Sequence, residues 1–129
     1  MAGAPTEIRL KRAERVLEVA WADGVRFALP AEYLRVESPS AEVQGHGPGQ
    51  RVTVGGRRHV GILRLEPVGN YAVRLVFDDL HDSGIFSWAY LRELGERQAE
   101  KWAAYEVALA EQGLSRDPLE QAASGRITR

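Results

Sequence analysis

Alternating apolar and polar positions predict strands along the first two thirds of the chain. Leu17, Val19 and Trp21 are separated by polar or small residues, and the same alternation continues after the pair Asp23-Gly24. A period of two residues is typical of a half-buried strand, and an Asp-Gly pair readily takes the positive φ angles of a type I′ turn. These positions predict a β-hairpin. Further strands are predicted at residues 7–12, 51–54, 59–67 and 71–77, and the last two are expected to pair.

Two segments between the strands have other patterns. Pro30 is expected to begin a short helical turn that reaches Leu34, because proline fits the first position of a helix. Residues 37–50 are mostly small and polar, with glycines and a proline gathered between Gly45 and Gly49. This segment predicts a long exposed loop.

Helical patterning begins near residue 87. Ser87 is expected to cap a helix that turns Trp88, Leu91 and Leu94 inward, and Gly95 is expected to end or kink that helix. The helical spacing places Trp88 in the core. The alternative is an aromatic partner-binding patch made of Ile85, Phe86, Trp88 and Tyr90.

A second helix is expected over residues 96–112. Its apolar stripe runs through Trp102, Tyr105 and Leu109, in line with Gln98, and Gly113 closes it. The pattern leaves open whether this stripe packs on the sheet or on another copy of the chain. Residues 114–129 have no periodicity and are predicted to be a disordered tail.

The order of these elements indicates the fold class. Strands come first and helices follow, which favours an α+β fold over a parallel doubly wound sheet. We expect two layers, with one mostly antiparallel sheet and the C-terminal helices packed on one face. The length of 129 residues fits a single domain, which we place at residues 1–113.

Composition and charge exclude several classes of protein. The chain has no cysteine, which rules out disulfides, thiolate catalysis and cysteine ligands for zinc or iron–sulfur clusters. A net charge of −1 gives no long-range attraction for nucleic acid. No apolar run approaches the ~18 residues that a membrane span needs, and the N-terminus lacks a signal-peptide pattern. We expect no nucleic-acid or membrane partner, and a cytoplasmic location.

The known catalytic motifs are also absent from the sequence. The glycine-rich loop at residues 38–50 lacks the Lys-Ser or Lys-Thr pair of a P-loop, and no helix pattern follows it. The chain has no G-x-S-x-G nucleophile elbow. We therefore expect a protein that is not an enzyme and that has no cofactor.

A metal site is the main chemical alternative. Asp79 and His81 would share one side of an extended strand, as a two-histidine, one-carboxylate site requires, with His46 or His59 as the second histidine. Asp82 follows His81 directly and would need a turn to share its metal. The simpler interpretation is a hydrogen-bonded structural histidine, so no metal is expected.

Three stretches of sequence carry a family resemblance. They are Trp21-Ala22-Asp23-Gly24, then Leu34-Arg35-Val36-Glu37-Ser38-Pro39-Ser40-Ala41-Glu42-Val43, then His81-Asp82-Ser83-Gly84-Ile85-Phe86-Ser87-Trp88. In this order and spacing the chain resembles the gamma-butyrobetaine hydroxylase-like N-terminal domain family, whose small bacterial members are usually called proteins of unknown function. The resemblance covers residues 6–95, with residues 96–112 as a helical extension.

The resemblance implies positions for a structural zinc. In the hydroxylases, a leucine-arginine pair is followed by three cysteines that bind zinc together with a later histidine. The corresponding positions here are Ser38, Ser40, Val43 and His81, so three of the four ligands are absent. The zinc is therefore not expected in this chain. The iron and 2-oxoglutarate chemistry of those enzymes belongs to a separate catalytic domain.

The resemblance also indicates a function. Related domains are appended to Mrp-type P-loop ATPases associated with iron–sulfur cluster assembly, and a domain that recurs beside unrelated catalytic domains suggests a docking part. We expect a non-catalytic protein-interaction or scaffolding module with an unknown protein partner. The resemblance links it to iron or iron–sulfur metabolism. Whether the chain forms a homo-oligomer stays open. The alternative is an iron- or zinc-binding protein that uses His81. The expected partner surface comprises Ser38, Ser40, His46, His81, Asp82, Ser83 and Gly84.

Overall fold

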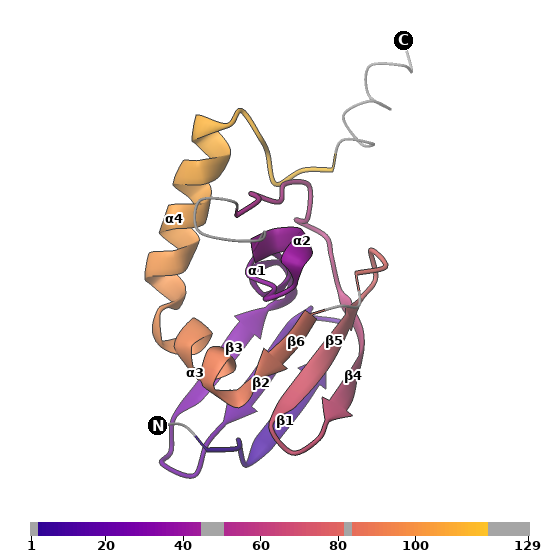
Figure 1. Cartoon of the computed structure of the whole chain (residues 1–129), viewed down its shortest axis with the longest axis vertical. Coiled ribbons are helices and arrows are strands. Elements are labelled where there is room, and N and C mark those ends of the chain that lie inside the picture. Colours follow the sequence, from indigo (N-terminus) through magenta and orange to yellow (C-terminus); the bar gives the residue numbers. More distant parts are fainter. Residues whose placement is uncertain (1–2, 45–50, 82–83, 119–129) are drawn as a thin grey trace.

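The structure is a computed structural model that describes residues 3–44, 51–81 and 84–118. Two three-stranded antiparallel sheets form in chain order (Figure 1). The first contains β1 (Glu7–Lys11), β2 (Val16–Ala20) and β3 (Arg26–Pro30), and the second contains β4 (Ile62–Val68), β5 (Ala72–Phe77) and β6 (Gly84–Ser87). The helices are α1 (Ala31–Val36), α2 (Ala41–Gln44), α3 (Trp88–Glu96) and α4 (Gln98–Glu111). The α+β class is confirmed, with the strands divided between two sheets.

The β2–β3 hairpin forms where the alternation predicts it, but its turn differs. The Trp21 N–H donates to the Val25 carbonyl at 2.9 Å, so residues 22–24 make the loop. Gly24 has a φ of +89°, whereas Asp23 is not among the residues with positive φ. The Asp23 carboxylate instead accepts the Val25 N–H at 3.2 Å. The type I′ prediction is therefore wrong, because a loop of three residues needs only one left-handed position.

The second sheet contains one strand that the sequence pattern did not reveal. The β4–β5 hairpin is confirmed, and Gly69 at its turn has a φ of +54°. The short strand β6 pairs with β5 and leads directly into α3, as Figure 1 shows. Its four residues are too few to show an alternation.

The region between α1 and β4 differs from the predicted exposed loop and strand. Glu37, Ser38 and Ser40 are buried, and residues 41–44 form α2. Residues 51–54 are not a strand. The Val52 N–H donates to the Val43 carbonyl at 2.7 Å, so this segment is held by α2 rather than by a sheet.

One apolar core joins the two sheets to α1 and α3. Its residues come from every layer, which explains why neither sheet needs its own core. Fully buried members include Leu17, Leu29, Leu34, Leu75, Phe77, Phe86, Leu91 and Leu94.

Helix α3 begins as predicted and ends differently. The Ser87 hydroxyl accepts the Tyr90 N–H at 3.1 Å, which confirms the N-cap. Trp88 is half-buried rather than fully in the core, and its Nε1–H donates to the Asn70 carbonyl at 2.8 Å. The helix ends at Glu96, one residue beyond the predicted stop at Gly95. A Cβ at Gly95 would overlap the Phe27 ring, so this glycine permits the close approach of α3 to β3.

Three tyrosine hydroxyls connect the helices to distant segments. Each donates to a backbone carbonyl, and burial is the main cause that raises the pKa of Tyr90 and Tyr105 to about 12. Burial raises the pKa of Tyr33 as well. All three therefore stay protonated donors at ordinary pH. The bonds are Tyr33 to Leu94 at 2.7 Å, Tyr90 to Glu37 at 2.5 Å and Tyr105 to Val54 at 2.5 Å.

Helix α4 follows the predicted stripe. Tyr105 and Leu109 are buried against Val36 of α1, with Trp102 packed beside them, and Gly113 follows the helix with a φ of +66°. The stripe therefore packs within the same chain. No helix in the described residues is long and apolar enough to cross a membrane.

The segment after α4 contradicts the predicted tail over residues 114–118. The Gly56 N–H donates to the Ser115 carbonyl at 2.8 Å, and the Arg58 N–H donates to the Arg116 carbonyl at 2.9 Å. The Arg116 guanidinium binds both carboxylate oxygens of Glu32 at 2.7 Å each. These contacts, and the ion pair of Asp117 with Arg58, use the backbone and charged groups, so they leave no hydrophobic period in the sequence. The rest of the predicted tail, residues 119–129, lies outside the described residues.

Candidate functional site

Three of the four family zinc positions meet in a buried cluster. Ser38 and Ser40 follow α1, and His81 ends the turn after β5. The His81 Nε2 atom lies 2.9 Å from the Ser38 hydroxyl and 3.3 Å from the Ser40 hydroxyl, and the two hydroxyls are 3.3 Å apart. All three residues are buried. We call Ser38, Ser40 and His81 the serine–histidine cluster.

The chemistry of these positions does not fit zinc. Val43, at the fourth position, is fully buried on α2 and supplies only methyl groups. Hydroxyls are not among the usual zinc donors, which leaves one imidazole nitrogen as a ligand. A Cβ at Gly84 would lie 2.8 Å from the Ser38 hydroxyl, so the glycine in β6 makes room for the cluster. The cluster therefore acts as a hydrogen-bonded connection between the loop after α1 and the turn after β5.

The alternative metal site is not assembled at Asp79. Its Oδ2 atom binds Arg35 Nε at 2.9 Å and Arg57 Nε at 2.7 Å. Burial acts to raise the pKa of Asp79, but the charge and hydrogen bond of Arg35, then the His81 N–H and the charge of Arg57, outweigh it and lower that pKa. Asp79 thus stays ionised and faces two arginines, while His81 Nε2 faces two serines.

Of the remaining residues of the metal hypothesis, the structure describes only His59. His59 is exposed in the segment before β4. His46 and Asp82 lie outside the described residues. Within residues 3–44, 51–81 and 84–118, no group of three or more His, Cys, Asp and Glu side chains could hold a metal ion.

The predicted partner surface is wrong for four of its residues. Ser38, Ser40, His81 and Gly84 are buried, so they cannot meet a partner directly. The prediction failed because a polar, glycine-rich segment was expected to be exposed. The other three, His46, Asp82 and Ser83, lie outside the described residues.

The neighbour of His81 has the opposite environment. Leu80 is 89% exposed and has a φ of +72°. Its N–H donates to the Phe77 carbonyl at 3.2 Å, and the Phe77 N–H donates to the His81 carbonyl at 2.9 Å, so the turn is closed by two hydrogen bonds. In the sequence pattern, Leu80 is only the spacer between Asp79 and His81. The one sequence signal that could have identified Leu80 was the presence of an aliphatic residue in an acidic stretch.

A second turn with a left-handed residue joins β1 to β2. Arg15, between β1 and β2, has a φ of +57°, and it and Leu80 are the non-glycine residues with positive φ in the described part of the chain. Gly61 lies between the two turns. Its carbonyl accepts the Asp78 N–H at 2.9 Å, and Arg15 Cγ is 3.9 Å from where a Cβ on Gly61 would lie.

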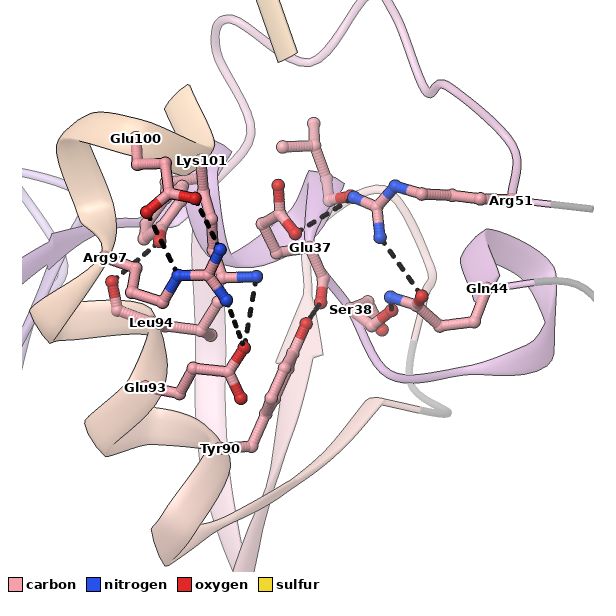
Figure 2. A network of polar contacts seen from close by, with 12 residues as sticks. Glu37, Ser38, Gln44, Arg51, Tyr90, Glu93, Leu94, Arg97, Glu100 and Lys101 are labelled. Carbon is pink, nitrogen blue, oxygen red and sulfur yellow. Dashed lines mark hydrogen bonds and ion pairs between the residues drawn. The ribbon is translucent and has the colours of Figure 1, made fainter. Parts of the chain in front are cut away.

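A pocket of about 430 Å³ lies between α4 and residues 51–54. Its charged side chains are paired with one another or with Glu93 of α3, as Figure 2 shows. Tyr90 reaches the same network through its bond to the Glu37 carbonyl. The pocket therefore resembles a structural ion-pair network more than a catalytic site. The pairs are Arg51 with Glu37, Arg97 with Glu93 and Glu100, and Lys101 with Glu93.

The fold and these clusters define a small α+β domain in which His81 and Asp79 have internal partners. The chain belongs to the gamma-butyrobetaine hydroxylase-like, N-terminal family, whose model matches residues 8–92. This confirms the resemblance noted from the sequence. No curated protein matches the chain.

Solved structures similar to the chain agree with this assignment. An NMR solution structure is 47% identical, with a TM-score of 0.80, and the match covers 92% of this chain and 93% of that one. A second NMR structure is 46% identical, with a TM-score of 0.78 and coverage of 92% and 88%. A crystal structure of a DUF971-family protein of unknown function from Acidithiobacillus ferrooxidans is 46% identical, with a TM-score of 0.60 and coverage of 71% and 92%.

Proposed function

We propose that the chain is a non-catalytic protein-interaction or scaffolding module of the cytoplasm, with a protein as its partner. The observation that carries the proposal is Leu80, a large aliphatic side chain that is 89% exposed and held in a left-handed conformation. On the family resemblance alone, we extend the proposal to a partner in iron or iron–sulfur metabolism.

The energetic cost of Leu80 supports the proposal. The left-handed conformation costs an L-residue with a Cβ roughly 1–2 kcal/mol, and glycine or asparagine would take it more easily. An exposed side chain gains almost nothing from the fold. Burial of a leucine in an interface gains about 1.5–3 kcal/mol. A backbone outlier of this kind is a reason to infer function, and contact with a partner would offset its cost.

The non-catalytic part of the proposal is supported by the pairing of the candidate residues. Catalysis by a general base or nucleophile needs a group within reach of a substrate. His81 faces Ser38 and Ser40 in the interior, and Asp79 is bound to two arginines. These contacts support a structural role for both residues.

The proposal is tested by the size of the particle that contains the chain. The purified chain should elute as a monomer of 14.3 kDa, and the same chain at natural abundance in a lysate of its own cells should elute in a larger particle. Leu80→Asn should return it to the monomer position, and Val107→Asn, at another exposed apolar residue, should not. A monomer in both samples would contradict the proposal. One equivalent of zinc or iron that is lost on His81→Ala would favour the metal-binding alternative.

A further inference from the structure

We propose that the chain has a binding site for an arginine of a partner protein, and that its own Arg116 occupies this site as an internal ligand. The site consists of Glu32 on α1, Trp102 on α4 and the backbone of residues 55–58, and we call it the arginine site. It involves residues other than Leu80. The inference therefore goes beyond the function proposed above and is tested independently of it.

The guanidinium of Arg116 contacts a carboxylate and an aromatic ring. Its Nε and Nη2 atoms donate to the two carboxylate oxygens of Glu32 at 2.7 Å each, and its central carbon lies 5.2 Å from the centre of the Trp102 ring. Arginine, unlike lysine, has a planar fork that fits a carboxylate at two points and stacks on an aromatic face. Glu32 and Trp102 together therefore select an arginine.

The two side chains that bind Arg116 are positioned by other parts of the fold. Glu32 lies in α1, where every residue is buried. The centre of the Trp102 ring lies 6.3 Å from that of Tyr33 in an edge-on arrangement and 5.1 Å from that of Tyr105. A site whose side chains are already held in place loses little conformational freedom when a ligand binds.

The Glu32 carboxylate needs a cation. Its side chain is only 9% exposed, and within the ranges that the structure describes no basic side chain other than Arg116 binds it. A nearly buried carboxylate without a partner is strongly unfavourable. When Arg116 moves away, another guanidinium is therefore favoured over water in its place.

The segment around Arg116 is also bound through its backbone. The Gly56 N–H donates to the Ser115 carbonyl at 2.8 Å, and the Arg58 N–H donates to the Arg116 carbonyl at 2.9 Å. Figure 1 shows this segment, in yellow, returning from α4 to the chain before β4. A Cβ at Gly55 would lie 2.8 Å from the Ser115 carbonyl oxygen, so this glycine permits the close approach. Bonds to carbonyls do not depend on the side chain, so another arginine-bearing segment can form them.

The segment is held by few apolar contacts. Ser115 and Asp117 are exposed, and Leu114 is 42% exposed. The ion pair of Asp117 with Arg58 lies at the surface, where such pairs contribute little. A segment of this kind opens locally well before the whole domain unfolds. Arg116 therefore exchanges with a competing arginine without unfolding of the core.

The internal ligand indicates what a partner segment has to supply. An arginine supplies the guanidinium, and an acidic residue directly after it supplies the ion pair that Asp117 makes with Arg58. The internal segment has the advantage of its high effective concentration, which is on the order of millimolar for a short linker. The segment thus sets a threshold that a partner overcomes by further contacts of its own.

The test uses the full chain and a labelled peptide with blocked ends and the sequence Leu-Ser-Arg-Asp-Pro of residues 114–118. The double variant Arg116→Ala, Asp117→Ala should bind this peptide at least about ten-fold more tightly than the unchanged chain, because its internal segment competes less well. Glu32→Gln, added to the double variant, should weaken the binding at least about ten-fold, and so should citrulline in place of the peptide's arginine. Glu111→Gln, at an exposed carboxylate, is the control and should leave it unchanged. The NMR signal of the Trp102 indole N–H should shift as the peptide binds.

A peptide library then examines the preferred sequence. Peptides of random sequence selected on the double variant should contain an arginine followed by aspartate or glutamate. Selected sequences without arginine would overturn the inference.

Three other results would overturn it as well. If the folded double variant does not bind the peptide at about 5 mM, Arg116 is only a structural clamp. Binding that survives Glu32→Gln would place the peptide elsewhere. A dimer of the unchanged chain that is lost in Arg116→Ala would mean that the exchanged segment is that of a second copy.

A further variant keeps the test decisive if the double variant does not fold. Arg116→Lys retains a positive charge at Glu32 and loses the two-point contact. It should bind the peptide more tightly than the unchanged chain does, and equal binding would overturn the inference.

Discussion

Leu80 and His81 are consecutive residues in opposite environments. The His81 ring lies inside the molecule against Ser38 and Ser40, and its side chain is tied to the loop after α1. The Leu80 side chain is almost fully exposed. One turn of the chain therefore holds a structural contact and an apolar residue that the fold does not use.

The turn explains why the backbone conformation at Leu80 and the position of His81 depend on each other. The bond from the Phe77 N–H to the His81 carbonyl closes the turn and returns His81 to the interior, and this requires a left-handed residue at position 80. The fold thus determines the conformation at position 80 but not the identity of the side chain. A glycine or asparagine would serve the turn as well. The contrast between the buried His81 and the exposed Leu80 indicates that the choice of leucine at position 80 has a cause outside the fold.

The largest effect is expected when the serine–histidine cluster is converted into a zinc site. In the triple variant Ser38→Cys, Ser40→Cys and Val43→Cys, three thiolates would join His81, at positions where two side chains already lie near His81 Nε2. The triple variant should bind one zinc per chain and gain stability on the order of 10 kcal/mol with the metal. Metal analysis and unfolding with and without chelator measure this effect. The unchanged chain should be insensitive to chelator, and a chelator-induced loss of its stability would contradict our account of the cluster.

His81→Ala is expected to have the next largest effect. It removes the partner of two buried hydroxyls and leaves a cavity beside Phe77, so the free energy of unfolding should fall by about 3 kcal/mol. His59→Ala, at an exposed histidine, is the matched control and should change it by less than about 0.5 kcal/mol. Denaturant titration of both variants gives the comparison. Equal effects would show that His81 is not structural.

Arg116→Ala tests whether residues 114–118 belong to the fold. The variant loses a bidentate ion pair with Glu32, whose side chain is only 9% exposed, and the contact of Arg116 with the Trp102 ring. We expect a loss of about 1–2 kcal/mol, because a nearly buried carboxylate remains without its partner. Thermal unfolding of Arg116→Ala and of the exposed-site control Glu111→Ala measures it. An unchanged melting temperature for Arg116→Ala would support the sequence prediction that the disordered tail begins at Leu114.

Ser87→Ala is expected to cost about 1 kcal/mol, because α3 loses its cap at Tyr90 N–H. Ser87→Asp keeps a side-chain acceptor at this position and should retain most of the stability. Urea denaturation of the two variants distinguishes the effect of losing the capping hydrogen bond from the effect of losing the hydroxyl group itself. Equal losses in both would mean that the cap is not what stabilises α3.

Local signals explain what the sequence could predict. The β2–β3 hairpin, the β4–β5 hairpin and the Ser87 cap depend on neighbouring residues, and each lies where the pattern places it. The short strand β6 and residues 114–118 depend on partners far away in the chain, so no local period marks them. The pattern at residues 51–54 predicted a strand, but these residues contact α2 and α4 instead.

The sequence likewise predicted one part of the candidate site and missed the rest. The family resemblance gathered Ser38, Ser40 and His81 correctly into one place, because the spacing of a motif reflects a shared fold. Their burial could not be predicted, since small polar residues are usually exposed. Leu80 was missed because a positive φ at a non-glycine residue is set by the closure of the turn and not by side-chain pattern.

The smallest expected effect tests the central claim, which is that the fold does not need the Leu80 side chain. Asparagine takes the left-handed conformation more easily than leucine, and almost no buried contact is lost at a site that is 89% exposed. Denaturant unfolding of Leu80→Asn should therefore give a free energy of unfolding equal to that of the unchanged chain or up to about 1 kcal/mol higher. A loss of more than about 1 kcal/mol would show that Leu80 stabilises the fold, and would contradict its assignment as a residue kept for a partner.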